Sequence, residues 1–218
     1  MAITLLPTDA IACRQPPRHD GVVSTVAGAG PAEGPEEGRA AHIEPDADAR
    51  RVRGHGRAEV EIPTARLILH GVDPVQAEQL AQGVSPLPCV PDYPHADTET
   101  AARMQRHALE VDNWVPGFGL YLMVRNDDGM VVGDIGFHTP PDVRGAVEVS
   151  YGVADSQRGR GYATEALKAL TRWAHRQGVA TVLAEVDPAN QASQAVLAKA
   201  GFLPVRADGP KLRLRHQG

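Results

Sequence analysis

A strand, a turn with two glycines and a long amphipathic helix follow one another between residues 146 and 177. The helix expected over residues 161–177 carries apolar residues at the spacing i, i+3, i+4, i+7, namely Ala163, Ala166, Leu167, Leu170 and Trp173. The turn before it reads Arg158-Gly159-Arg160-Gly161. Free backbone N–H groups and the helix dipole make such a helix start an anion site. Because its glycines add no bulk and its arginines add positive charge, the turn is predicted to bind a diphosphate.

Two common phosphate-binding motifs do not fit this turn. A Walker A loop needs a Lys-Ser/Thr pair after its second glycine, and this pair is missing here. The dinucleotide fingerprint G-x-G-x-x-G needs a third glycine where Thr164 stands, and the preceding strand belongs to a hairpin rather than to a βαβ unit. The alternatives are therefore a different phosphate ligand or a plain turn before an amphipathic helix.

The pattern along residues 62–217 predicts one α/β domain. Strands are expected over residues 66–70, 120–124, 130–137, 146–153, 182–186, 202–206 and 211–215. Helices are expected from a cap at Asp73 to about Gln82, over residues 97–110 and 161–177, and from a cap at Asn190 to Gly201. The order β-α-α-β-β-β-α-β-α-β-β predicts a mixed sheet with helices packed on it.

Residues 1–58 are predicted to be a disordered, low-complexity N-terminal extension. They hold none of the nine aromatic residues, but six of the 18 prolines and seven of the 22 glycines. Such a segment cannot bury enough apolar surface to offset the conformational entropy of the chain. Its basic cluster at residues 50–57 could touch a phosphate backbone, but Asp46 and Asp48 beside it favour a solvated tail.

The composition excludes several classes of function. A net charge of −5 provides no positive field that recruits nucleic acid or an anionic membrane surface. No apolar run reaches the ~18 residues of a membrane span, and no export signal is apparent, so a cytoplasmic protein is expected. Two cysteines cannot form a disulfide framework, in keeping with a reducing compartment. The nine histidines lack metal-ligand spacing, so no metal is expected.

Three motifs resemble the GNAT superfamily of acyl-CoA-dependent N-acetyltransferases across residues 62–217. Arg158-Gly159-Arg160-Gly161-Tyr162-Ala163 matches its R/Q-x-x-G-x-G/A loop. Residues 187–202 are similar to its N-x-x-S helix and the G-F strand start that follows. Arg66-Leu67-Ile68-Leu69 resembles the opening strand of the branch that includes ribosomal-protein alanine N-acetyltransferases. The resemblance implies the GNAT fold, an α+β arrangement whose largely antiparallel sheet is flanked by helices and splays apart at the acetyl-CoA site.

The resemblance also assigns residues to acetyl-CoA, the expected acyl donor, which would lie between the splayed strands at 146–153 and 182–186. The pyrophosphate would bind to the amides of Arg158, Gly159, Arg160, Gly161, Tyr162 and Ala163. Val153, just past a bulge and next to Tyr151 and Gly152, would offer its backbone to the pantetheine arm. An N–H near it would polarise the thioester carbonyl, a contact worth on the order of 3 kcal/mol. Asn190 would bind a pantetheine amide, cap its helix, or do both, with Ser193 close by.

The implied reaction is aminolysis of a thioester, which needs a neutral amine. At pH 7, deprotonation costs about 4.6 kcal/mol for a lysine amine and about 1.4 kcal/mol for an α-amine, so a general base helps both. Glu148, in the middle of its strand, is the expected base, and Asp134 and His138 are second choices. The alternative for Glu148 is an outward-facing strand residue with no role in the chemistry.

The proton donor to the leaving thiolate departs from the family pattern. Many relatives use a tyrosine on the last helix, but no tyrosine lies between Thr181 and Gly218. Ser193 is the nearest substitute, unless its hydroxyl serves only its own backbone. Glu148 and Ser193 are therefore the expected catalytic residues.

The expected activity is transfer of an acetyl group from acetyl-CoA to a primary amine in a ternary complex. A protein N-terminal α-amine and a small-molecule amine are both open as acceptors, because acceptor loops vary independently of the scaffold. The resemblance implies that residues 83–118 help wall the acceptor pocket, where their acidic side chains would suit a cationic amine. The alternative is a catalytically weak acyl-CoA sensor. A monomer or homodimer is expected.

Overall fold

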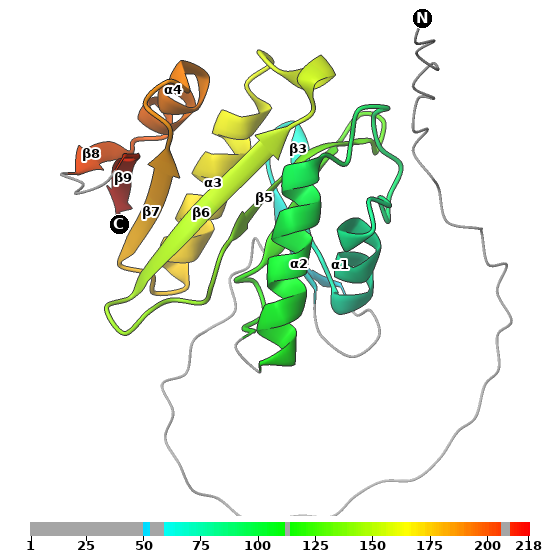
Figure 1. Ribbon diagram of the computed structural model, residues 1–218, viewed down its shortest axis with the longest axis horizontal. Helices are drawn as coiled ribbons and strands as arrows, with labels where there is room; N and C mark the ends of the chain where they lie inside the picture. Colours follow the sequence, from blue (N-terminus) through cyan, green and yellow to red (C-terminus); the bar gives the residue numbers. More distant parts are fainter. Residues whose placement is uncertain (1–49, 53–58, 112–113, 206–209) are drawn as a thin grey trace, which may run out of the picture.

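A computed structural model describes residues 50–52, 59–111, 114–205 and 210–218 (Figure 1). The strands are β1 (Arg50–Val52), β2 (Glu59–Pro63), β3 (Leu67–Gly71), β4 (Leu120–Arg125), β5 (Val131–Phe137), β6 (Ala146–Val153), β7 (Thr181–Val186), β8 (Leu203–Val205) and β9 (Leu212–Gln217). The helices are α1 (Pro74–Ala81), α2 (Ala96–Glu110), α3 (Tyr162–Arg176) and α4 (Gln191–Lys199), with a 3-10 turn, η1, at Asp155–Gln157.

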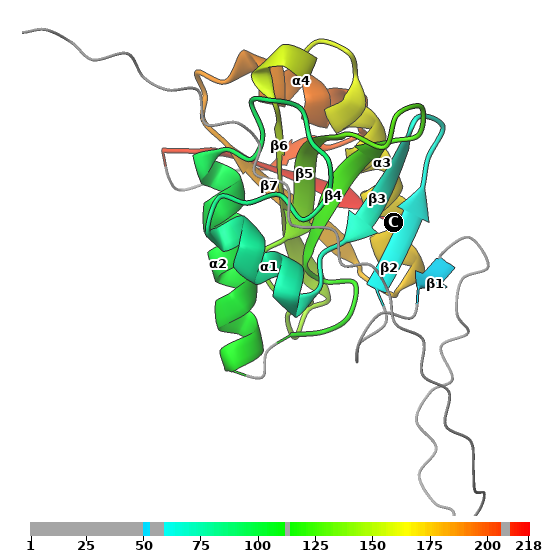
Figure 2. The ribbon, with the colours of Figure 1, turned by 90° about the vertical axis from the view of Figure 1, so that its right-hand side faces the viewer.

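The strands form one sheet in the order β1-β2-β3-β4-β5-β6-β7-β9-β8. Neighbouring strands are antiparallel, except for β6 and β7, which run parallel. Helices α1 and α2 cover one face of the sheet and α3 covers the other (Figure 2). The prediction of a mixed, largely antiparallel sheet flanked by helices is confirmed.

The first two strands were not predicted. The segment of β2 alternates over only a few positions and ends on Pro63, so its pattern is too short to indicate a strand. The β1 strand pairs with β2 and belongs to the segment 1–58 that was expected to lack regular structure. The rest of that segment lies outside the described residues, so its disorder stays a prediction.

Local signals place the helices where they were expected. Asp73 accepts the backbone N–H of Gln76, and the Gln76 side chain accepts the backbone N–H of Asp73, so a complete capping box starts α1. The start of α2 differs from expectation, because it is capped by His95, whose side chain accepts the N–H of Thr98.

The core beneath α3 supports the strands that lead to the site. Leu167, Leu170 and Trp173 of α3 are buried against the sheet. The Trp173 ring lies 5.2 Å from that of Phe118 and 6.3 Å from that of Phe137. This packing fixes α3, and therefore the turn at its start, against β4 and β5. None of the helices in the described part of the chain combines the length and apolar composition that a bilayer crossing requires.

Candidate active site

The β6 and β7 strands separate after three residue pairs, which are Ala146↔Thr181, Val147↔Val182 and Glu148↔Leu183. Beyond Glu148, β6 keeps its pairing with β5, whereas β7 keeps its pairing with β9 as far as Val186. The two facing strand edges are therefore not paired with each other in this described segment. Backbone N–H and C=O groups along such edges need other partners, and an extended ligand with amide groups can provide them.

The bulge expected before Val153 is not observed, and that detail of the prediction was wrong. The β5–β6 register runs unbroken from Phe137↔Val149 to Gly133↔Val153. A register shift lies instead in β4, between Leu122 and Val124. The opening between β6 and β7 therefore comes from the divergence of two twisted strands, each following its other neighbour.

The turn between β6 and α3 has the backbone of an anion site. Gly159 and Gly161 have φ angles of +76° and +83°, a left-handed backbone conformation that residues with a side chain rarely adopt. Gly161 is the N-cap of α3 and provides no side-chain hydrogen bond to the first turn. A Cβ atom built on Gly159 meets nothing within 4 Å, so the space beside the turn is open. The first amides of α3 are thus uncapped and accessible, which fits the diphosphate predicted for residues 158–163.

Contacts from other segments hold the approach to this turn. Asp92, in the loop before α2, accepts hydrogen bonds from the backbone N–H and the hydroxyl of Ser156, at 2.9 and 2.7 Å. The backbone bond from Ser156 is the main reason why the pKa of Asp92 lies below its ordinary value. Arg125 of β4 donates to the Gln157 side chain at 3.2 Å. Arg158 donates to the carbonyl of Val153 at 3.3 Å, so this carbonyl already has a partner.

Two of the three candidate bases lie together. The His138 Nδ1 atom is 3.4 Å from Glu148 Oε1, and the two side chains are 34% and 33% exposed. The backbone N–H of His138 also donates to the carbonyl of Glu148 at 3.0 Å. The antiparallel β5–β6 register brings these residues together, ten positions apart in the sequence. A carboxylate and an imidazole at this distance can accept and relay a proton while remaining open to solvent.

A hollow that is open to solvent lies beside His138, between α2 and the β5–β6 strands. Its lining is mostly apolar and includes Ala101, Met104, Ala108, Phe118, Phe137 and Ser150, with His138 at one side. The expectation that residues 83–118 wall a pocket agrees with this lining. The acidic residues of that segment do not line it: Asp92 binds Ser156, and Glu99 and Glu110 pair with arginines of α2. Asp112 lies outside the described residues.

Asp134, the third candidate base, is in a different environment. It is 5% exposed and accepts a hydrogen bond from the hydroxyl of Thr98. Burial raises its pKa above the ordinary value, while the bond from Thr98 and the charge of His95 lower it. The carboxyl group is thus enclosed, unlike the side chains of Glu148 and His138, which are each about one third exposed. Gly152 borders this cluster, and a Cβ at this position would lie 2.7 Å from His95 Nε2, so the β6 strand needs glycine here.

The opening between β6 and β7 is bridged by two hydroxyl groups. The Tyr151 hydroxyl lies 2.7 Å from Ser193 Oγ and 3.2 Å from the Ser193 carbonyl. Burial raises the pKa of Tyr151, so the phenol keeps its proton at neutral pH. The Tyr151 hydroxyl on β6 thus reaches Ser193, in the first turn of α4. Tyr151 was predicted to lie beside the pantetheine arm, but its contact with Ser193 was not predicted, because strand alternation is the only signal for it in the sequence.

Asn190 caps α4, since its Oδ1 atom accepts the backbone N–H of Ser193 at 3.0 Å. Among the described residues, no cluster of three His, Cys, Asp or Glu side chains could hold a metal ion. His70 lies within β3, and its Nδ1 atom is 3.3 Å from Glu61 Oε1 on the neighbouring strand β2.

Comparison with known proteins agrees with this geometry. The family model "Acetyltransferase (GNAT) domain" matches residues 66–203. The uncharacterized N-acetyltransferase YjdG of Bacillus subtilis (strain 168) is 33% identical over 113 residues, which span 51% of this chain and 67% of that protein. The solved acetyltransferase from Agrobacterium tumefaciens str. C58 is 24% identical, with a TM-score of 0.52 over 72% of this chain and 94% of its own.

A structure of RimL, a ribosomal L7/L12 alpha-N-protein acetyltransferase in complex with coenzyme A, shares the same fold. It is 19% identical, with a TM-score of 0.52 over 72% of this chain and 97% of its own. The family resemblance of the motifs is thereby confirmed. The chain belongs to the GNAT acetyltransferase family, and it is an acetyl-CoA-dependent N-acetyltransferase.

Proposed function

We propose that the protein transfers the acetyl group of acetyl-CoA to a primary amine by direct aminolysis in a ternary complex. The observation that supports this proposal most strongly is the position of the Glu148–His138 pair. It lies where β6 begins to leave β7, and its His138 lines an open hollow where the acceptor would bind. The two substrates would therefore meet on the two sides of β6.

The proposed acetyl-CoA site runs from the turn before α3 along β6. The uncapped amides of residues 159–163 would receive the diphosphate, with Arg158 and Arg160 adding positive charge. The segment Tyr151-Gly152-Val153, beyond the last β6–β7 pair, would bind the pantetheine amides, and a backbone N–H there would polarise the thioester carbonyl. Asn190, already the cap of α4, would present its free amide group to the same arm.

The proposed reaction moves two protons, one from the amine and one to the leaving thiolate. The amine nitrogen forms a bond with the thioester carbon, and its proton passes to Glu148, with His138 stabilising the carboxylate before transfer. The carbon–sulfur bond then breaks. The thiolate takes a proton from the Ser193 hydroxyl, which in turn is hydrogen-bonded to Tyr151 and recovers a proton through it or through water.

The lining of the hollow favours one kind of acceptor. Its walls are mostly apolar, and none of the described acidic side chains of residues 83–110 lines it, so the lining itself offers no carboxylate to a polycation. A peptide α-amine with a small or apolar first side chain fits these walls, and it is also the amine that costs less to deprotonate. The alpha-N-protein activity in the name of RimL is consistent with this choice. We further propose that the protein works in the cytoplasm as a monomer or homodimer.

The proposal is tested by measuring CoA release from acetyl-CoA with three kinds of acceptor: peptides with free N-termini, the same peptides with blocked N-termini, and polyamines. We expect turnover with the free peptides alone. The Glu148→Gln variant should lose about 10² to 10⁴-fold in kcat while binding acetyl-CoA as the wild type does. Glu99→Gln, on α2 outside the hollow, is the matched control. Acetyl-CoA binding without turnover on any amine would identify the sensor alternative instead.

A further inference from the structure

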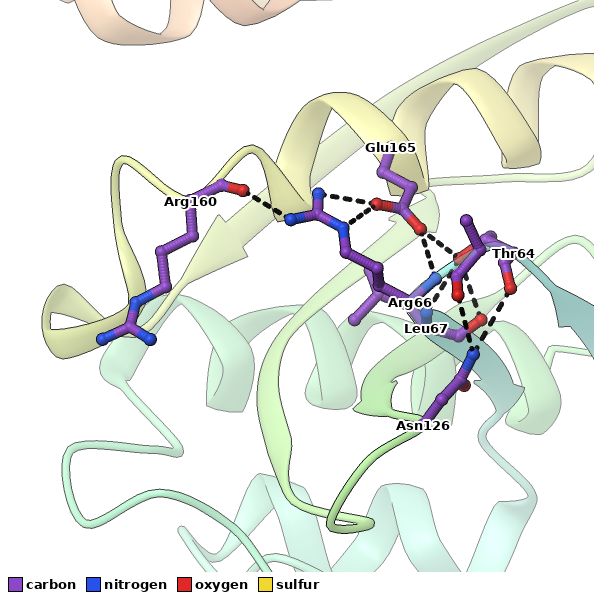
Figure 3. Close-up of polar contacts among 7 residues, drawn as sticks. Thr64, Arg66, Leu67, Asn126, Arg160 and Glu165 are labelled. Atoms are coloured by element: carbon purple, nitrogen blue, oxygen red, sulfur yellow. Dashed lines mark hydrogen bonds and ion pairs between the residues drawn. The ribbon is translucent and has the colours of Figure 1, made fainter.

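Arg66, the first residue of the motif that opens the domain, contacts the start of α3 (Figure 3). Its Nε and Nη2 atoms both lie 2.7 Å from Glu165 Oε2, and its backbone N–H donates to Oε1 at 2.8 Å. The hydroxyl of Thr64 donates to the same Oε1 at 2.7 Å. One carboxylate in the first turn of α3 therefore receives four contacts from the segment that leads into β3.

The same guanidinium also holds the turn itself. Its Nη1 atom donates to the backbone carbonyl of Arg160 at 2.9 Å, and its carbon lies 5.0 Å above the centre of the Tyr162 ring. Arg66 thus contacts three residues between positions 160 and 165. Its own position is braced, because the backbone N–H of Asn126 donates to the Arg66 carbonyl at 3.0 Å.

The charge of Glu165 gives these contacts a consequence for ligand binding. Glu165 is 17% exposed, and the bonds from Thr64 and Arg66 outweigh burial, so its pKa lies below the ordinary value and it is ionised at neutral pH. A carboxylate in the first turn satisfies the helix dipole, and it repels any second anion that binds there. A paired guanidinium cancels that repulsion while leaving the first-turn amides free.

We propose that Arg66 is a positioning residue for the acyl donor: it neutralises Glu165 and fixes the path of the turn at Arg160, so that the first amides of α3 can accept a diphosphate. This inference rests on the proposed function, in which residues 158–163 bind the diphosphate of acetyl-CoA. The motif residue at the start of β3 would therefore act about a hundred positions further along the chain, at the cofactor turn.

The test is calorimetric titration of CoA into the wild type, four variants of the Arg66–Glu165 pair and one control variant. Arg66→Ala should weaken CoA binding about tenfold or more, because it loses the charge-assisted bonds and exposes the Glu165 charge. Arg66→Lys keeps the charge but loses the planar fork, so its loss should be smaller. Glu165→Gln should bind within about threefold of the wild type, since it removes the repulsion together with the pair. Arg66→Ala/Glu165→Gln should bind more tightly than Arg66→Ala alone.

The double variant separates positioning from simple structural support. If Arg66 only stabilised the fold, removing Glu165 as well would leave CoA binding no better. Arg103→Ala removes a comparable arginine–glutamate pair on α2 and is the control, expected to bind as the wild type does. Thermal unfolding of each protein without CoA checks that the fold is kept.

Two results would overturn the inference. One is that Arg66→Ala binds CoA within about twofold of the wild type, and the other is that the double variant binds CoA no more tightly than Arg66→Ala does. Should Arg66→Ala not fold, Arg66→Lys decides: weaker binding at an unchanged melting temperature supports the inference, and wild-type binding contradicts it. A wild type that does not bind CoA refutes the assignment of the turn, and the role of Arg66 falls with it.

Discussion

Thr98→Val is the most informative test of the buried polar cluster under β6. Thr98 is fully buried, and its hydroxyl donates to Asp134, which is 5% exposed. Valine keeps the shape of threonine but removes the donor, and water has little access to replace it. A buried carboxylate would then lack one of its hydrogen bonds.

The expected loss of stability follows from the negative charge of Asp134, which accepts the hydrogen bond from Thr98. A hydrogen bond to a charged group contributes about 1.5–3 kcal/mol, so the variant should lose about 2 kcal/mol of unfolding free energy at pH 7.5. For a domain of roughly 150 residues this lowers the melting temperature by about 4–8 °C. Thr98→Ser keeps the hydroxyl and should lose much less.

The loss should depend on pH in a stated direction. Burial raises the pKa of Asp134 above 3.8 in the folded state, so between 3.8 and the folded pKa the folded protein binds the extra proton. In that window stability falls as pH rises, and above it the buried charge exerts its full cost. Removing Thr98 raises the folded pKa further. The difference between variant and wild type should therefore be largest at pH 7.5 and shrink toward pH 4.

Urea unfolding of the wild type, Thr98→Val and Thr98→Ser at pH 7.5 and pH 4 measures these differences. A loss of equal size at both pH values would refute the reasoning, because it would mean that the charge of Asp134 does not set the cost. The Asp134→Asn background provides an internal check. There the carboxylate is absent, and Thr98→Val should cost about 1 kcal/mol or less at either pH.

Three other predictions follow from contacts described above. Ser193→Ala should lower kcat about 10²-fold with acetyl-CoA affinity unchanged, and Tyr151→Phe should lower it less, as steady-state kinetics and titration would show. Asp73→Ala removes the capping box of α1 and should cost about 1 kcal/mol in urea unfolding. Burial and the neighbouring His175 lower the pKa of His216, so the unfolded chain binds this proton more readily and stability should fall as pH drops below about 6.5. His216→Gln should flatten that part of the stability curve.

Local chemistry explains why the turn at α3 was predictable. Two glycines, an amphipathic helix and the preceding strand all lie between residues 146 and 177, so their pattern needs no knowledge of the tertiary fold. The same holds for Asp73 and for the hairpin between β4 and β5, where each signal acts on its own neighbours. The β2 strand escaped notice because its five residues hold a proline and too few alternations.

The pairings in the site were not predictable in this way. Glu148 and His138 were separate candidates until the β5–β6 register set them side by side. Tyr151 and Ser193 are 42 residues apart, and Arg66 and Glu165 are 99 apart. Such contacts depend on strand order and helix packing, which propensities and motifs do not encode. The contact of Ser193 shows the limit, since its partner Tyr151 lies on a strand that the helix motif does not include.

At the turn before α3, the glycines of the motif and the residues outside the motif have different roles. The glycines give the backbone its left-handed path, but residues outside the motif hold that path still: Asp92 at Ser156, Arg125 at Gln157 and Arg66 at Arg160. These three come from the loop before α2, from β4 and from the approach to β3. A diphosphate site works only if its N–H groups already point at the ligand, because ordering them on binding consumes affinity. The loop before α2 also leads into the helix that lines the hollow beside His138, so Asp92 links this side of the molecule to the turn before α3 through one carboxylate.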